Sequence, residues 1–235
     1  MQSSEGLGFQ LFSVPHICWL IIAAASCVAL CLIYRRKDEV SRRRLELCVA
    51  GLILFSELVK KLSLIIAGEY SVYDLPLHLC GMAVFISLVH AARGWKFTGE
   101  LLYSACMPGA AFALIFPDWV RYPVFNFLSM NSFFVHILLT AYPLMLFFGG
   151  EIRPEAKRLP YCFLFLAVVS APVYVFNKLV DANFLFLNWP SPGSPLEWFE
   201  RWLGNPGYIL GYIPMMVLVW TALYLPVELR RRHKS

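Results

Sequence analysis

The stretch Val14–Tyr34, VPHICWLIIAAASCVALCLIY, is apolar along almost its whole length and runs directly into Arg35, Arg36 and Lys37. A helix needs about 20 predominantly apolar residues to cross the hydrocarbon core of a bilayer. Basic residues at the end of such a helix favour the cytoplasmic side of the membrane. The sequence therefore predicts a membrane-spanning helix here, with its N-terminal end outside.

Six further apolar stretches of similar length follow, and together the seven fill most of the 235 residues. They are Leu45–Gly68, Leu75–Ala92, Thr98–Phe116, Ser132–Phe148, Leu159–Lys178 and Gly207–Glu228. Hydrophobic residues make up 59% of the chain, well above the roughly 45–50% that is usual in soluble domains. We expect an all-α polytopic membrane protein with seven transmembrane helices, forming a single domain over residues 1–235.

Lysine and arginine gather in alternate connections between these stretches. They are Arg35, Arg36, Lys37, Arg42, Arg43 and Arg44, then Arg93 and Lys96, then Arg153, Lys157 and Arg158, and finally Arg230, Arg231, Arg232 and Lys234. In the other connections the only basic residues are Arg121 and Arg201, with Lys178 at the end of an apolar stretch. The positive-inside rule then predicts an N-terminus outside and a C-terminus in the cytoplasm. The net charge of +5 follows from this topology, so it does not indicate a nucleic-acid partner.

Two segments outside the apolar stretches carry further expectations. Residues 1–10 contain Glu5 and no lysine or arginine, so they lack the positive n-region of a cleaved signal peptide, and we expect the first helix to stay as an anchor. The longest irregular segment, at about 180–206, is expected outside the cytoplasm. Within it, Pro195–Leu203 has the amphipathic pattern of a short interfacial helix.

Reactive side chains gather near the outer ends of the expected helices. All seven cysteines lie in apolar stretches, which argues against a disulfide framework. If Cys80 is a nucleophile, it needs a base, because the thiolate is the reactive form of cysteine. His78 is an unsuitable base because residues two apart on a helix point in different directions. His136 is the preferred base, and His16 is the second choice.

Charged residues also occur inside the second apolar stretch. Glu57 precedes Lys60 and Lys61 by three and four residues, a spacing at which a local ion pair forms easily. In the alternative interpretation, Glu57 orients a catalytic histidine or one of the lysines holds a lipid phosphate. A structural role is preferred for Lys61, whereas both interpretations stay open for Glu57 and Lys60.

Several short motifs resemble the YwaF-like integral membrane family, which includes the eukaryotic transmembrane protein 164. They are Phe9-Gln-Leu-Phe-Ser-Val-Pro-His16, Leu75-Pro-Leu-His-Leu-Cys80, Ser132-Phe-Phe-Val-His136, Asn177 with Asn183-Phe-Leu-Phe-Leu187, and Leu203-Gly-Asn-Pro-Gly-Tyr208. The resemblance implies a seven-helix membrane protein. The eukaryotic relative is described as a cysteine-centred acyltransferase of ether phospholipids, which implies Cys80 and His136 as the catalytic pair. We expect a multi-pass protein of the bacterial cytoplasmic membrane.

The preferred hypothesis is a lipid acyltransferase or transacylase that works from the outer half of the bilayer through a thioester acyl-enzyme. Its partners are phospholipids and lysophospholipids, and it needs no cofactor if the acyl donor is itself a lipid. Asn177, Asn183 or Tyr208 could donate hydrogen bonds to the oxyanion, as such sites require.

Three alternatives remain open at the level of the sequence. With water as the acceptor, the same cysteine would make a hydrolase. His16, His78 and His136 could instead hold a metal ion with one open coordination position, as in a metal-dependent lipid hydrolase. The third alternative is a receptor, a lipid-binding protein or a transporter without catalytic activity. The sequence does not indicate an oligomeric state.

Overall fold

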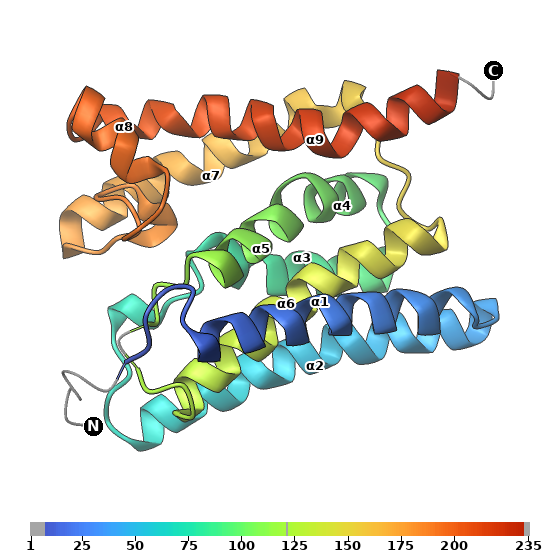
Figure 1. The fold of residues 1–235 in the computed structure, drawn as a ribbon, viewed down its shortest axis with the longest axis horizontal. Helices are drawn as coiled ribbons and strands as arrows, with labels where there is room; N and C mark the ends of the chain where they lie inside the picture. Colours follow the sequence, from blue (N-terminus) through green and yellow to red (C-terminus); the bar gives the residue numbers. More distant parts are fainter. Residues whose placement is uncertain (1–7, 121, 233–235) are drawn as a thin grey trace. The chain divides into compact units, whose positions relative to one another are not determined.

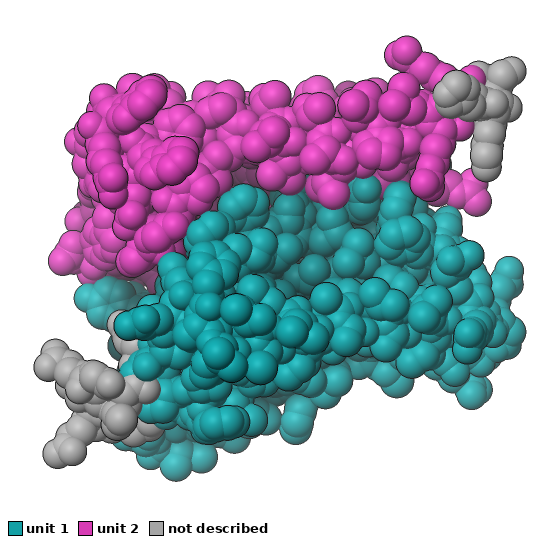
Figure 2. All heavy atoms as spheres, viewed as in Figure 1, with its two compact units in different colours: residues 1–152 teal, residues 153–235 magenta. Residues whose placement is uncertain are grey.

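The computed structural model describes residues 8–120 and 122–232. Within these ranges the regular secondary structure is helical and contains no strand, which confirms the expected all-α class (Figure 1). The chain forms two compact units, unit 1 (residues 1–152) and unit 2 (residues 153–235), which are coloured separately in Figure 2. The expectations that concern Glu5, Arg121 and Lys234 lie outside the described residues.

Unit 1 is built around one long helix, α6. Its helices are α1 (Val14–Arg35), α2 (Glu39–Ile66), α3 (Leu79–Arg93), α4 (Lys96–Leu101), α5 (Met107–Ile115) and α6 (Phe127–Gly149), with a short 3₁₀ turn η1 (Val72–Asp74) before α3. A π-helical turn, η2 (Leu102–Cys106), joins α4 to α5 without a break. Helix α6 packs against α1, α2, α3 and α5, so its side chains form much of the core of this unit.

Unit 2 contains two long helices and the irregular segment between them. Its elements are η3 (Ala156–Arg158), α7 (Leu159–Val180), η4 (Phe184–Phe186), α8 (Leu196–Leu203), η5 (Gly207–Gly211) and α9 (Tyr212–Arg232). The expected short helix at Pro195–Leu203 is confirmed by α8. Leu196 is its buried residue, whereas Trp198 and Trp202 are exposed.

Five helical segments are long and apolar enough to cross a membrane. They are α1, the continuous α4–α5 segment, α6, η3 with α7, and η5 with α9. Helix α3 is apolar but has only 15 residues. Helix α2 has 28 residues but carries charged side chains toward both of its ends. The described residues therefore establish a helical protein with five candidate spans.

The start of α3 differs from the prediction. The apolar stretch begins at Leu75, but the helix begins at Leu79, after His78 as the N-cap. Pro76 instead packs across the helix, so close that a Cβ atom on Gly81 would lie 2.8 Å from the Pro76 Cα atom. This turn places Cys80 in the first turn of α3.

Two other helices begin earlier than the apolar stretches that predicted them. Helix α6 starts before Ser132 because the Asn126 side chain accepts a hydrogen bond from Leu128 N at 2.8 Å, which caps the helix at Phe127. Helix α2 starts at Glu39, several residues before Leu45. Arginine and glutamate are good helix formers, so charged residues extend the helix beyond its apolar part.

Candidate active site

Cys80 lies where the chain enters α3 and is partly exposed. Met82 N donates a hydrogen bond to His78 O at 3.0 Å and closes the first helical turn. The backbone N–H groups of the preceding helical residues, Leu79, Cys80 and Gly81, have no partner inside the helix. The first turn of α3, which contains Cys80, thus offers backbone donors that can bind an anion.

His136 lies roughly two and a half turns into α6 and is also partly exposed. Its Nδ1 atom lies 2.7 Å from Ser132 O, in the preceding turn of the same helix. A carbonyl oxygen only accepts hydrogen bonds, so Nδ1 carries the proton in this contact. In the neutral ring, Nε2 is then the basic nitrogen, which is the tautomer that a general base requires.

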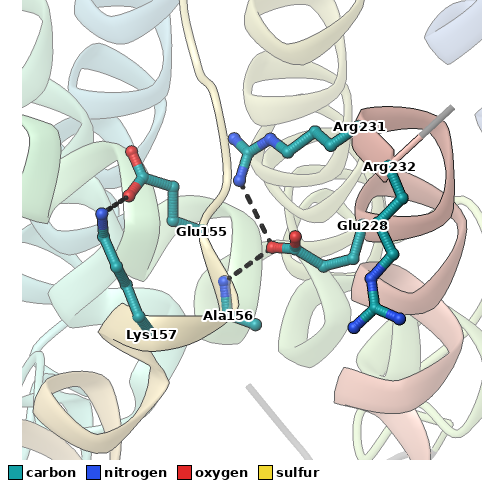
Figure 3. Close-up of a pocket in the computed structure, with 6 residues that line it drawn as sticks. All are labelled: Glu155, Ala156, Lys157, Glu228, Arg231 and Arg232. Atoms are coloured by element: carbon teal, nitrogen blue, oxygen red, sulfur yellow. Dashed lines mark hydrogen bonds and ion pairs between the residues drawn. The ribbon is translucent and has the colours of Figure 1, made fainter. Parts of the chain in front are cut away.

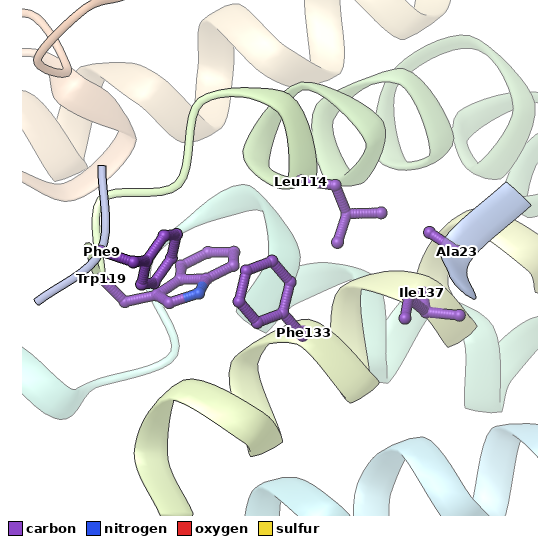
Figure 4. Packing of buried hydrophobic residues seen from close by; sticks show 6 residues of the cluster. All are labelled: Phe9, Ala23, Leu114, Trp119, Phe133 and Ile137. Atoms are coloured by element: carbon purple, nitrogen blue, oxygen red, sulfur yellow. The ribbon is translucent and has the colours of Figure 1, made fainter. Parts of the chain in front are cut away.

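Aromatic side chains support one face of the His136 ring. The Trp119 indole packs on the imidazole with ring centroids 4.8 Å apart, and it meets Phe133 edge-on at 5.3 Å. Trp19 stacks on Phe133 at 4.7 Å, and Phe9 lies 5.7 Å from the same ring. Figure 4 shows Phe9, Trp119 and Phe133 gathered in this cluster. The cluster restricts the orientation of His136.

Charged groups from two further elements act on the same residues. Glu57 and Lys60, on α2, form an ion pair at 2.8 Å, which confirms the predicted local pairing. Lys60 interacts electrostatically with His78, Cys80 and His136. Glu57 acts in the same way on Cys80 and His136, so the charged residues of α2 influence the start of α3 and the first half of α6.

Asp118 also acts on these residues, although nothing in its sequence context indicated a role. Its carboxylate interacts electrostatically with His78, Cys80 and His136. It lies in the connection between α5 and α6, next to Trp119, which contacts His136. The available signal was its position in the connection between the apolar stretches Thr98–Phe116 and Ser132–Phe148. That signal does not distinguish Asp118 from its neighbours.

Lys61 has the structural role that the sequence analysis preferred. Its Nζ atom donates to Asp74 O in the turn before α3, and it also lies 5.9 Å from the centre of the Tyr70 ring. These contacts tie the end of α2 to the turn that leads to Cys80.

His16, the second-choice base, has both ring nitrogens bonded to the backbone. Phe12 N donates to Nδ1 at 2.9 Å, and Nε2 lies 2.8 Å from Leu114 O. The ring is completely buried. His16 thus fastens the segment before α1 to the end of α5, and neither nitrogen is available to a thiol.

The alternative three-histidine metal site is not supported by this geometry. Among the described residues, no three or more His, Cys, Asp and Glu side chains are placed to hold a metal ion. The hydrogen bonds of His16 explain this result, because a metal ligand needs an unprotonated ring nitrogen with a free lone pair. The interpretation of His16, His78 and His136 as metal ligands is therefore set aside.

The proposed oxyanion donors of unit 2 instead hold their own loop together. The Asn177 side chain donates to Phe184 O at 2.8 Å and accepts from Phe184 N at 2.9 Å. Asn183 donates to Trp189 O at 2.9 Å and accepts from the backbone N–H groups of Asn188 and Trp189. Both side-chain amides supply hydrogen-bond partners to backbone groups of a segment that has no regular secondary structure.

Tyr208 acts in the same way on η4. Its hydroxyl donates to Phe186 O at 2.8 Å, and the Tyr212 hydroxyl donates to Leu185 O at 2.8 Å. Leu185 and Phe186 have φ angles of 57° and 51°, which are unfavourable for bulky side chains. The two tyrosines therefore stabilise a strained turn.

A family model, described as the TMEM164 family, matches residues 11–224. The chain belongs to the TMEM164 family. The matched range includes Cys80, His136 and the motifs that carried the resemblance, apart from Phe9 and Gln10 at the start of the first motif. No curated protein and no solved structure matches the chain. Family membership and the five apolar helices identify a multi-pass membrane protein.

Proposed function

We propose that this TMEM164-family protein is a membrane-embedded lipid acyltransferase, with Cys80 as the nucleophile and His136 as the general base. The observation that carries the proposal is the bond between His136 Nδ1 and Ser132 O, which leaves Nε2 basic, while the same charged residues act electrostatically on His136 and Cys80. A cysteine nucleophile and an oriented histidine are the two groups that thioester chemistry requires.

The reaction proceeds in two half-reactions. His136 Nε2 takes the Cys80 proton, and the thiolate attacks the ester carbonyl of a donor phospholipid. The tetrahedral intermediate collapses to a thioester, and the leaving alkoxide takes the proton from the imidazolium to give a lysolipid. His136 then deprotonates the hydroxyl of an acceptor lipid, which attacks the thioester and regenerates the thiol.

The backbone amides of the first turn of α3 are the proposed oxyanion donors. They belong to the same turn as the Cys80 sulfur, whereas the amides of Asn177 and Asn183 bind the loop backbone in unit 2. Donors that are already fixed in the folded protein stabilise the developing charge without reorganisation. Tyr208 is likewise not proposed as an oxyanion donor, because its hydroxyl donates to Phe186 O in the loop.

Lys60 and His78 are the proposed contacts for the polar part of the substrate. Lys60 is partly exposed and, although paired with Glu57, adds positive charge beside Cys80. A phospholipid phosphate would be attracted to this side of the site. The proposed partners are therefore phospholipids and lysophospholipids of a bacterial cytoplasmic membrane, bound from the extracytoplasmic leaflet.

The test uses the purified full-length protein in mixed micelles that contain a labelled donor phospholipid and a lysophospholipid. Cys80→Ala is expected to lower acyl transfer at least about a thousandfold, because it removes the nucleophile. Cys48→Ala, at an exposed position on α2, is the matched control and should retain full activity. Mass spectrometry of the wild-type protein should detect an acyl adduct on the peptide that contains Cys80.

Two outcomes would decide against parts of this proposal. Undiminished transfer by folded Cys80→Ala would remove this residue from the mechanism. Release of free fatty acid that does not respond to added lysophospholipid would instead identify a hydrolase with the same catalytic pair.

A further inference from the structure

A charged cavity lies in unit 2 where the chain enters α7 and where α9 ends. Its volume is about 350 Å³, within the range of small-ligand sites. Six residues line it: Glu155, Ala156, Lys157, Glu228, Arg231 and Arg232 (Figure 3). The cavity therefore combines three cationic side chains with two carboxylates, and all six of its residues belong to unit 2.

Internal bonds hold the carboxylates in place. Glu228 Oε1 accepts from Ala156 N at 3.2 Å and from Arg231 Nη1 at 3.3 Å. Both contacts use one oxygen, so Oε2 of the same carboxylate can accept a further donor. In Figure 3, Arg231 and Arg232 extend on opposite sides of this carboxylate. Glu228 is thus an acceptor held by Ala156 and Arg231, and Arg232 also lines the cavity.

The second carboxylate is saturated by cations. Glu155 pairs with Lys157 and with Arg158, each at 2.7 Å. Lys157 is 78% exposed and Arg231 is 41% exposed, so their cationic ends can reach a ligand at the mouth of the cavity. Of the two carboxylates, that of Glu228 is the one with an oxygen that can accept a hydrogen bond from a ligand.

Exposed apolar side chains continue from the cavity along both helices. Tyr161 and Leu164 are exposed on α7, and Leu225 and Leu229 are exposed on α9. Both helices are apolar enough to cross a membrane. A lipid whose headgroup occupies the cavity would place its acyl chains along these residues, which would remain in an apolar environment.

We propose that this cavity binds the headgroup of a phospholipid with a primary amine, as in phosphatidylethanolamine. The phosphate contacts Arg231, Arg232 and Lys157, and the ammonium group donates to Glu228. A purely anionic headgroup would meet the same cations but would be repelled by the two carboxylates. A choline headgroup carries a positive charge but has no N–H with which to donate to Glu228.

Native mass spectrometry of the full-length protein, released from detergent with each lipid in turn, tests the proposal. The probes are phosphatidylethanolamine, phosphatidylcholine and phosphatidylglycerol with identical acyl chains. The protein is expected to retain the ethanolamine lipid about tenfold more tightly than the choline lipid, the effect of one hydrogen bond to a charged group. Equal retention of all three lipids, or preference for phosphatidylglycerol, would overturn the assignment.

Two variants separate the roles of the side chains. Glu228→Gln is expected to weaken the ethanolamine lipid about tenfold and to leave the glycerol lipid unchanged or tighter. Gln keeps an acceptor for Ala156 N, so the fold should persist. Arg232→Gln should weaken all three lipids, because each has a phosphate. Glu39→Gln, an exposed change of equal charge on α2, should alter none.

Soluble glycerophosphoethanolamine distinguishes a lipid from a free phosphoester. It is expected to displace the lipid only at much higher concentration, because it lacks chains that could bind along α7 and α9. Equal potency would contradict the lipid as the ligand. An unchanged ethanolamine preference in Glu228→Gln would contradict the role of this carboxylate. Neither result depends on the activity proposed for Cys80.

Discussion

At the scale of single residues, two histidines with similar sequence surroundings have different roles because their ring nitrogens have different partners. Both ring nitrogens of His16 bind backbone groups, and one of these bonds reaches Leu114, 98 residues along the chain. His136 uses only Nδ1 for a backbone carbonyl in its own helix. Burial fits this division, since His16 is fully buried whereas His136 is partly exposed.

This division predicts opposite results for two alanine variants. His16→Ala should lower the free energy of unfolding by about 2–4 kcal/mol, because it leaves two buried backbone groups unbonded, while activity per folded molecule persists. His136→Ala should lower acyl transfer by about 10²–10⁴-fold and change stability by only about 1 kcal/mol. Denaturant titration and activity assays on the same preparations provide both values. Loss of activity in well-folded His16→Ala would contradict the assignment.

At the scale of elements, the turn before α3 determines where the nucleophile lies. Its direction depends on the close contact between Pro76 and Gly81, which no side chain at position 81 would permit. The 15-residue helix then carries Cys80 at its start, beside backbone donors that have no partner inside the helix. Gly81 therefore has a positional role: through the backbone of this turn it determines where Cys80 lies.

Gly81→Ala is expected to disturb this element. The added methyl group would lie 2.8 Å from a backbone atom of Pro76, so the turn must move, at a cost of about 1–3 kcal/mol and more than about tenfold in activity. Gly51→Ala on α2 is the matched control, since a Cβ atom there has no neighbour within 4 Å. It should leave activity intact and stabilise the helix by up to about 1 kcal/mol. Equal behaviour of the two variants would refute the packing argument.

The connection that leads into α7 predicts a dependence of stability on pH. The Lys157 side chain donates to Glu155 and is the main cause that lowers the pKa of this carboxyl, with Arg158 adding to it. A carboxyl whose pKa is lower in the folded state stabilises the protein above its unfolded-state pKa. This contribution is lost as the pH falls through the folded-state pKa.

Thermal unfolding near neutral pH and again at about pH 3 measures this contribution. The wild-type protein should lose more stability on acidification than Glu155→Gln, which has no carboxyl to protonate. Glu39→Gln, an exposed change of the same charge, should behave like the wild-type protein. Identical acid sensitivity of wild type and Glu155→Gln would show that the ion pairs of Glu155 contribute nothing to folding.

At the scale of the whole molecule, the seven apolar stretches of the sequence and the alternation of basic connections predict an N-terminus outside and a C-terminus in the cytoplasm. Five segments qualify as spans by length and composition. Helix α3 has 15 residues, about 22 Å, less than the roughly 30 Å of a bilayer core. Helix α2 is long enough but carries charges. The seven-span proposal therefore depends most on these two helices.

Reporter fusions along the chain test this topology. Alkaline phosphatase is active only outside the cytoplasm. It is expected to be active when fused to the connection before α3, to the connection after α5 or to the segment that contains α8. It should be inactive after the basic connections that follow α1, α3 and α6, and at the C-terminus. Activity at the connections on both sides of α3 would show that this helix does not cross the membrane.

The sequence alone determined the all-α class, the apolar segments and the local Glu57–Lys60 pair. All of these depend on composition or on residues close together in the chain. It did not determine the start of α3, the neighbourhood of Asp118 or the bonds of His16 and Asn177. Those depend on which backbone groups lack helical partners, and only the folded chain decides which side chains satisfy them.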